Sequence, residues 1–275
     1  MKNKPHTEQA FRPKRQLGQN FLIDPNILRI ILKSAQPLKE RTVFEVGPGT
    51  GTLTKALLEE GARVVAVETD PTLSERLRGE IGKSEGLTLI EGDVLKLNLK
   101  DLFKEHKIEK VVSNLPYKIT SPLLYEIAQL PALPEELVLM VQWETARRIS
   151  ARWGEKDYSA LGILLSLSYQ VTIVHRVSPQ AFRPRPKVES AIVKLRLKNN
   201  PAPPSLRTAA KEVLAWGFSH PRKMVAKSLS LGNPKVDWRR LLKKCGIDPQ
   251  KRPHQLKEEE WVVLSEHWLN SHTGD

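Results

Sequence analysis

Four consecutive residues of the chain, Asn114, Leu115, Pro116 and Tyr117, have side chains and a spacing that suit chemistry on an amino group. An amine on an aromatic base is a poor nucleophile, because its lone pair is delocalised into the ring. A site that activates such an amine needs acceptors for its two N–H bonds and a flat surface for the ring. The Asn114 side-chain oxygen and the Leu115 or Pro116 carbonyl can accept, and Tyr117 can stack on a base. The same residues also fit a strand that ends in a proline turn without chemistry, so the rest of the chain must decide.

A glycine-rich turn forms the second motif, Glu45-Val46-Gly47-Pro48-Gly49-Thr50-Gly51. It follows a predicted strand over residues 42–46 and precedes a predicted helix over residues 52–60, so a ligand would lie beside the start of a helix. The spacing G-x-G-x-G differs from the dinucleotide fingerprint, and Glu45 would repel a pyrophosphate. An acid at this position instead suits a ligand with a cationic amine, such as the amino-acid end of S-adenosylmethionine.

Two further acids follow the next two predicted strands. Glu68 comes directly after the strand over residues 63–67, where a carboxylate can bind the two hydroxyls of a ribose. Asp93 follows the strand over residues 87–91 and can accept a hydrogen bond from the amine of an adenine. A glycine turn, a Glu and an Asp at three successive strand ends predict a nucleoside pocket.

The elements that must position these residues alternate between strands and helices, which predicts an α/β fold with a mostly parallel sheet. The Asn114 motif ends the fourth strand, because the apolar run before it is typical of a buried parallel strand. Asp24-Pro25 begins a helix over residues 26–34, and residues 158–169 form a helix that covers the core. Further strands are expected over residues 137–142, 171–177 and 188–197, the last an edge or antiparallel strand because apolar and basic residues alternate in it.

The loop over residues 182–190 combines prolines, Phe182 and the cations Arg183, Arg185 and Lys187. Phe182 and Tyr117 could hold an extruded base between them while the cations bind backbone phosphates. A rigid connector with solvated charges is the alternative.

The charge of the chain is concentrated in its two ends. The net charge is +13, yet residues 21–180 carry twenty Lys and Arg against twenty-one Asp and Glu. Residues 1–20 have five basic residues against one Glu, and residues 181–275 have nineteen basic residues against nine acids. A neutral α/β part with basic flanks is what a polyanionic partner requires. A solvated basic surface without a partner is the alternative.

After a proline-rich linker at residues 199–204, helices are expected near residues 206–217, 221–231, 235–245 and 256–269. Four tryptophans should supply the core of this part, and the basic residues should form one face, again with a merely solvated face as the alternative. The tryptophans are Trp216, Trp238, Trp261 and Trp268. The basic residues are Arg222, Lys223, Lys227, Arg239, Arg240, Lys243 and Lys244.

Cys245 is the single cysteine, so the sequence offers no disulfide and no cysteine-based metal site. The first apolar residues after the basic start are interrupted at Asp24, which argues against a signal peptide. The longest uncharged run, residues 158–174, is too polar and too short for the ~20 apolar residues of a membrane span. A cytoplasmic protein is expected.

Taken together, the motifs resemble the KsgA (RsmA) family of small-subunit ribosomal RNA adenine dimethyltransferases over residues from about 14 to 260. They occur at six places in the order of that family: residues 16–22, Glu45 to Gly51, Glu68, Asp93, Asn114 to Tyr117, and Phe182 to Ser190. The resemblance implies a Rossmann-like class I methyltransferase sheet with a small helical C-terminal domain. The expected division is a basic segment 1–24 that contributes to the cofactor and RNA site, a catalytic domain 25–198 and an RNA-binding domain 199–275.

The resemblance also implies the chemistry. S-adenosylmethionine donates two methyl groups to the N6 amine of each of two adjacent adenosines near the 3′ end of 16S RNA, leaves as S-adenosylhomocysteine, and no metal takes part. The substrate would be the RNA in a pre-30S particle, and the enzyme a monomer. Carried over, the cofactor contacts fall on Asn20, Leu22, Gly47, Glu68, Asp93 and Asn114, with Glu45 and the glycine turn, including Gly49, beside them. Asn114, Leu115, Pro116, Tyr117 and Phe182 would act on the base.

One segment departs from the family pattern. A paired-arginine stretch is usual in the C-terminal part, whereas here His220-Pro221 precedes Arg222-Lys223. This departure does not affect the predicted methyl transfer, but it leaves the RNA contacts of the C-terminal part undetermined. Three alternatives remain: an Erm-like enzyme acting on 23S RNA, a DNA-adenine or protein-glutamine methylase with a similar fourth-strand motif, and a ribosome-assembly factor that keeps the fold without turnover.

Overall fold

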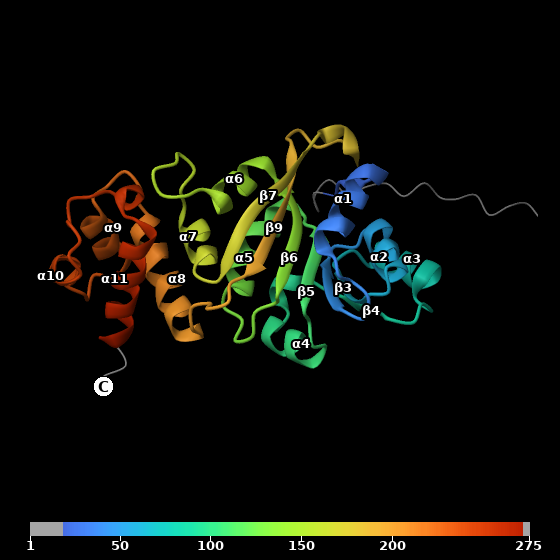
Figure 1. Cartoon of the computed structure of the whole chain (residues 1–275), viewed down its shortest axis with the longest axis horizontal. Coiled ribbons are helices and arrows are strands. Elements are labelled where there is room, and N and C mark those ends of the chain that lie inside the picture. Colours follow the sequence, from blue (N-terminus) through green and yellow to red (C-terminus); the bar gives the residue numbers. More distant parts are fainter. Residues whose placement is uncertain (1–18, 272–275) are drawn as a thin grey trace, which may run out of the picture.

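A computed structural model describes residues 19–271. A seven-stranded sheet forms its centre, with the strand order β4-β3-β2-β5-β6-β9-β7 (Figure 1). The strands β2 to β6 run parallel to one another, and β9 and β7 are antiparallel. The strands of this sheet are β2 (Thr42–Val46), β3 (Arg63–Glu68), β4 (Leu87–Glu91), β5 (Lys110–Asn114), β6 (Glu136–Gln142), β7 (Tyr169–Val177) and β9 (Ser190–Leu197).

Strand β2 lies between β3 and β5, so the chain reverses its direction of winding at β2 and β5. These two strands pair only near their amino ends, through Val43 with Lys110 and Phe44 with Val111. Toward the carboxyl ends the gap is bridged by the buried Ser113 hydroxyl, which donates to the Val46 carbonyl at 2.7 Å and accepts from its N–H at 3.3 Å. A crevice at such a reversal is where open α/β sheets bind ligands.

Helices cover both faces of the sheet, as Figure 1 shows, and give the chain three layers. Alternate strand residues face opposite sides, so Phe44 and Val111 join one hydrophobic cluster and Val43 and Val112 the other. The second cluster is closed by α1 and α2, the first by α4, α5 and α7. The helices of this part are α1 (Pro25–Ala35), α2 (Thr52–Glu59), α3 (Pro71–Ile81), α4 (Leu99–Glu105), α5 (Thr120–Ile127), α6 (Trp143–Ser150) and α7 (Ala160–Ser166).

Four helices follow the sheet and pack at one end of the molecule: α8 (Pro204–Phe218), α9 (Val225–Gly232), α10 (Trp238–Lys244) and α11 (Glu258–Asn270) (Figure 1). Trp216, Trp238 and Trp268 pack ring against ring at centroid distances of 5.2–5.7 Å, and Trp261 is buried beside Phe218. The tryptophans thus form the core expected from the sequence. This core is continuous with the cluster on one face of the sheet.

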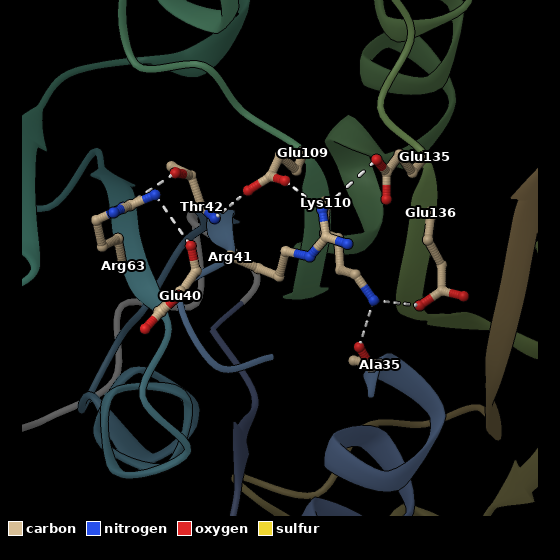
Figure 2. A network of polar contacts seen from close by, with 9 residues as sticks. All are labelled: Ala35, Glu40, Arg41, Thr42, Arg63, Glu109, Lys110, Glu135 and Glu136. Atoms are coloured by element: carbon tan, nitrogen blue, oxygen red, sulfur yellow. Dashed lines mark hydrogen bonds and ion pairs between the residues drawn. The ribbon is translucent and has the colours of Figure 1, made fainter. Parts of the chain in front are cut away.

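The amino ends of the parallel strands are held by a network of charged residues, drawn in Figure 2. Buried Lys110 at the start of β5 donates to Glu136 of β6 at 3.1 Å and to the Ala35 carbonyl at the end of α1 at 2.7 Å. Lys194 pairs with the other oxygen of Glu136 at 2.7 Å. Arg41 pairs with Glu109 nearby. These contacts fix α1 to the edge of the sheet opposite the crevice.

The strand over residues 188–197 is antiparallel, as expected, but it is not an edge strand. Strand β9 lies between β6 and β7, and β7 forms the edge. Of its alternating basic residues, Lys194 pairs with the buried Glu136 and donates to the Ser34 carbonyl, whereas Arg196 and Lys198 are exposed. The covering helix is also shorter than predicted, because Ser159 caps it and the chain turns into β7 at Tyr169.

None of the helices in residues 19–271 is long and apolar enough to cross a membrane.

Candidate active site

A cavity of about 240 Å³ opens at the carboxyl ends of the parallel strands. Its walls are the segments that follow β2, β3, β4 and β5, together with the short strand β1 (Phe21–Leu22) and the two residues before it. Eleven of the twelve residues that the sequence assigned to catalysis or cofactor binding line it: Asn20, Leu22, Glu45, Gly47, Gly49, Glu68, Asp93, Asn114, Leu115, Pro116 and Tyr117. Phe182 does not.

The glycine turn brings backbone close to this cavity. Gly47, Gly49 and Gly51 all have positive φ angles, of 68°, 59° and 79°. A Cβ on Gly49 would lie 2.9 Å from the ring of Phe21, so this position has no room for a side chain. Gly51 begins α2 without any side-chain cap, which leaves the first N–H groups of the helix available to a ligand.

Glu45 of β2 is buried at the inner wall of the cavity, 2% exposed. Burial raises the pKa of its carboxyl to about 8, the hydroxyl of Thr54 opposes this by donating to it at 2.7 Å, and the charge of Glu68 adds to the rise. No other described residue donates to this carboxylate. A ligand with a cationic amine would supply the counter-charge that the protein withholds.

Glu68 at the end of β3 is fixed by the backbone. Its two oxygens accept from the N–H of Gly49 at 3.0 Å and the N–H of Asp70 at 2.9 Å. Burial raises the pKa of this carboxyl, and these hydrogen bonds oppose the rise. Each oxygen retains a further lone pair, so the group can accept two hydroxyls from a ribose.

Asp93, after β4, is half-buried, and one of its oxygens accepts from the Leu95 N–H at 3.1 Å. Its second oxygen receives no hydrogen bond from a described residue. The carboxylate can therefore accept from an amine in the cavity.

Asn114 ends β5 with its side chain held in one orientation. Its amide nitrogen donates to the Asn20 carbonyl at 3.1 Å, and no described residue donates to its amide oxygen. The Leu115 carbonyl is likewise without a donor in the described chain, whereas the Pro116 carbonyl accepts from Ile119 at 3.1 Å and from Thr120 at 3.3 Å. Of the two carbonyls offered by the sequence, Leu115 is the better second acceptor for an amine.

Tyr117 begins the 3-10 turn Tyr117–Ile119, and its ring is half-buried. Its hydroxyl shares a hydrogen bond of 2.7 Å with the buried Ser190 at the start of β9. Burial raises the pKa of the phenol, and the Ser190 contact partly offsets this, so the ring stays neutral at physiological pH. The hydrogen bond fixes the plane on which a base could stack.

The N-terminal segment, residues 19–22, forms one wall of the cavity. Gln19 donates to Asp70 at 3.0 Å, and the Phe21 ring packs on Gly49. Phe21 and Leu22 pair with Arg183 and Phe182 of the short strand β8 (Phe182–Arg183). Residues 16–18, the rest of the first family motif, lie outside the described residues.

Phe182 is only 3% exposed and packs in the same hydrophobic cluster as Leu22. Its ring does not line the cavity, and its pairing with Tyr117 around a base stays a prediction. Arg183, Arg185 and Lys187 are exposed, as are the seven basic residues predicted on the C-terminal helices.

Sequence reasoning overlooked the residues that orient the others: Thr54 under Glu45, Ser113 between the strands, Ser190 behind Tyr117, and Gln19 on Asp70. Thr54 alone had a local signal, since it lies one turn into the helix that faces the strand carrying Glu45. The others meet their partners from distant parts of the chain.

Comparison with known proteins agrees with this geometry. The model of the ribosomal RNA adenine dimethylase family matches residues 10–269. Proteins named ribosomal RNA small subunit methyltransferase A are 36% identical, that of Clostridium botulinum (strain Langeland) over 93% of this chain and 94% of its own, that of Clostridium perfringens (strain SM101) over 93% and 90%.

Solved structures agree as well. A dimethyladenosine transferase from Plasmodium falciparum superposes with a TM-score of 0.71 at 27% identity, over 89% of this chain and 95% of that one. The 23S rRNA methyltransferase ErmE gives 0.63 at 25% identity, over 90% and 99%. The sheet, the helical C-terminal part and these matches together show that the chain belongs to the ribosomal RNA adenine dimethylase family.

Proposed function

We propose that the protein transfers methyl groups from S-adenosylmethionine to the N6 amines of two adjacent adenosines near the 3′ end of 16S RNA. The observation that carries this proposal is the fixed amide of Asn114. Because its nitrogen is engaged by the Asn20 carbonyl, its oxygen is the atom that remains to accept from an amine in the cavity.

The residues of the cavity fit the cofactor. When bound, S-adenosylmethionine supplies a methyl group on a positively charged sulfur. Glu45 would face its amine, Glu68 its ribose and Asp93 its adenine, and Gly47 and Gly49 would let backbone approach it. A buried carboxylate with a single hydroxyl donor favours such a cationic ligand.

The chain would activate the target amine by accepting hydrogen bonds from its two N–H groups, one at the Asn114 oxygen and one at the Leu115 carbonyl. This holds the amine with its lone pair directed at the cofactor side and increases electron density on nitrogen. Tyr117 stacks on the base. No general base is required, because a nitrogen that has gained a methyl group is strongly acidic and loses its proton to water; positioning and exclusion of water carry most of the rate.

The RNA would contact the exposed cations of the loop over residues 183–187 and those between residues 222 and 244. The helices α9 and α10 of this second region lie at one end of the molecule (Figure 1). Between residues 219 and 252 ten basic residues face two acids, which suits a phosphate backbone. We propose the catalytic domain 25–198, the RNA-binding domain 199–275, a pre-30S particle as substrate, a monomeric enzyme and a cytoplasmic location.

An Erm-like activity on 23S RNA is the second candidate, favoured by the superposition on ErmE. The small-subunit assignment is preferred because the relatives at 36% identity are small-subunit methyltransferases.

The experiment is to incubate the protein with labelled cofactor and undermethylated small or large subunits, then to locate the label. Two adjacent dimethyladenosines near the 3′ end of the small-subunit RNA are expected. Asn114→Ala should lose activity and the exposed Asn26→Ala should retain it. Label only in the large subunit would establish the second candidate, and cofactor binding without transfer to either RNA would indicate an assembly factor.

A further inference from the structure

A second, smaller recess lies between α5, α6 and α7 and shares no lining residue with the cofactor cavity. Its volume is about 60 Å³, against about 240 Å³ for the cofactor cavity. A recess of this size has room for several water molecules or a tetrahedral anion. Its polar lining residues are Ser121, Tyr125, Thr145, Arg148 and Ser159.

Most of these polar groups have no partner inside the protein. Within residues 19–271 the side chains of Ser121, Tyr125, Thr145 and Arg148 make no hydrogen bond or ion pair, whereas Ser159 caps α7. No carboxylate lines the recess. Burial raises the pKa of the Tyr125 phenol, although the Arg148 charge opposes this, so the hydroxyl stays a donor at neutral pH.

The neighbouring arginine behaves differently. Arg147 pairs with Asp157 at 3.4 Å and does not line the recess. Arg148, in contrast, has no ion-pair partner in the described chain and lines the recess with the hydroxyls of Ser121, Tyr125 and Thr145. Glu144 lies one helical turn before it but does not line the recess. Arg148 is exposed, and an arginine beside hydroxyl donors in a recess that no acid lines is a set of groups that can bind a phosphate.

The recess lies near the catalytic residues along the chain. The cofactor cavity is lined as far as Ile119 and the recess from Ser121 onward, so one residue separates them. Ser121 is in the first turn of α5, which directly follows the turn that carries Tyr117. Helix α6 begins at Trp143, where β6 ends at the same edge of the sheet.

We propose that this recess binds one backbone phosphodiester of the substrate RNA, next to the nucleotide whose base stacks on Tyr117. Arg148 supplies the charge, and Ser121, Tyr125 and Thr145 supply hydrogen bonds. This inference rests on the proposed function, since it concerns the same RNA. It adds an anchoring site that positions the extruded nucleotide from its backbone.

The test measures the affinity of the full chain for a labelled 3′ fragment of small-subunit RNA at several salt concentrations. Arg148→Ala should weaken binding roughly 3–10-fold and flatten the slope of log K against log salt by about 0.7–0.9, the value for one lost phosphate contact. Tyr125→Phe and Thr145→Val should each weaken binding about 2–5-fold without changing the slope, because they remove neutral donors. Arg148→Lys should keep the slope.

Arg147→Ala is the matched control, and it should change affinity less than about twofold. An equal change of slope in Arg147→Ala and Arg148→Ala, or an unchanged slope in Arg148→Ala with a melting temperature like that of the wild type, would overturn the proposal. Inorganic phosphate, titrated at constant ionic strength, forms a separate arm: phosphate binding that needs Arg148 while the RNA slope stays unchanged would assign the recess to a free anion. If the wild-type protein does not methylate the RNA, the proposed function is refuted instead. Cofactor binding, measured by calorimetry, should be equal in all variants.

Discussion

The side-chain amide of Asn114 donates to the backbone carbonyl of Asn20, 94 positions earlier in the chain, at 3.1 Å. This contact joins the end of the central strand to the segment that closes the cavity. It also decides which end of the amide is available for chemistry. The oxygen of Asn114 receives no hydrogen bond from a described residue, so it is the atom that could accept from a ligand.

The first prediction concerns this orientation. Asn114→Asp replaces the donor to Asn20 by a second acceptor and adds a charge, so the methylation rate in a single turnover should fall by about 10²-fold or more. Cofactor affinity should change much less, because Glu45, Glu68 and Asp93, the carboxylates proposed to bind the cofactor, are unchanged. A single-turnover rate within threefold of the wild type would contradict the role given to this amide.

The second prediction concerns the pH dependence of stability. The pKa of Glu45 is raised to about 8, so between its ordinary value of 4.5 and about 8 the folded protein binds a proton that the unfolded chain releases. Stability without cofactor should therefore fall as pH rises through this range. Glu45→Gln removes that slope and should raise the free energy of unfolding at pH 8 by about 1–3 kcal/mol, measured by urea unfolding.

The same variant should lose cofactor affinity by at least about tenfold, because a neutral amide cannot balance the charge of an amine. A protein that is both more stable and unable to bind cofactor would separate the functional from the structural effect of this carboxylate. Unchanged cofactor affinity in calorimetry would place the amine elsewhere.

The third prediction concerns Thr54, whose hydroxyl favours the ionised form of Glu45. Thr54→Val should raise the pKa of Glu45 further and weaken cofactor binding about 3–10-fold at pH 7, with an effect that shrinks as the pH rises and ionises Glu45 in both proteins. Thr54→Ser keeps the hydroxyl and should restore binding. An effect of equal size at pH 7 and at higher pH would show that Thr54 acts through packing alone.

The fourth prediction separates two demands on Gly49. Gly49→Ala is strained by its φ of 59° and also contacts the Phe21 ring, whereas Gly154 has a φ of 88° and open space around it. Gly154→Ala should thus measure the backbone cost alone, and Gly49→Ala should destabilise by about 1–3 kcal/mol more in thermal or urea unfolding. Combining it with Phe21→Ala should remove most of the difference; equal effects of the two alanines would mean that the segment over the cavity is displaced easily.

The fifth prediction concerns the network in Figure 2 at the opposite edge of the sheet. Lys110→Met leaves Glu136 with Lys194 as its remaining partner, so unfolding should become easier by about 2–4 kcal/mol. The folded fraction should keep its cofactor affinity, because these residues do not line the cavity. A loss of affinity at temperatures where the variant is folded would show that the network affects the site.

The sequence alone determined the sheet and the candidate site, because both depend on local order. Residues at the carboxyl ends of parallel strands meet at one edge of the sheet whatever the details of packing. The order of the strands in the sequence therefore predicts that Glu45, Glu68, Asp93 and Asn114 surround one cavity. Strand and helix positions followed from apolar patterns, and four tryptophans marked the C-terminal core.

Tertiary structure alone decided what depends on distant contacts. The position of β9 inside the sheet is set by its antiparallel pairing with β6 on one side and β7 on the other, which no local pattern encodes. The choice of Leu115 over Pro116 as acceptor depends on hydrogen bonds that already occupy the Pro116 carbonyl. The burial of Phe182 against Leu22 comes from a strand pair that joins residues about 160 positions apart. Sequence order specifies which side chains reach an edge; the orientation of each one is set by partners that only the folded chain brings within a few ångströms.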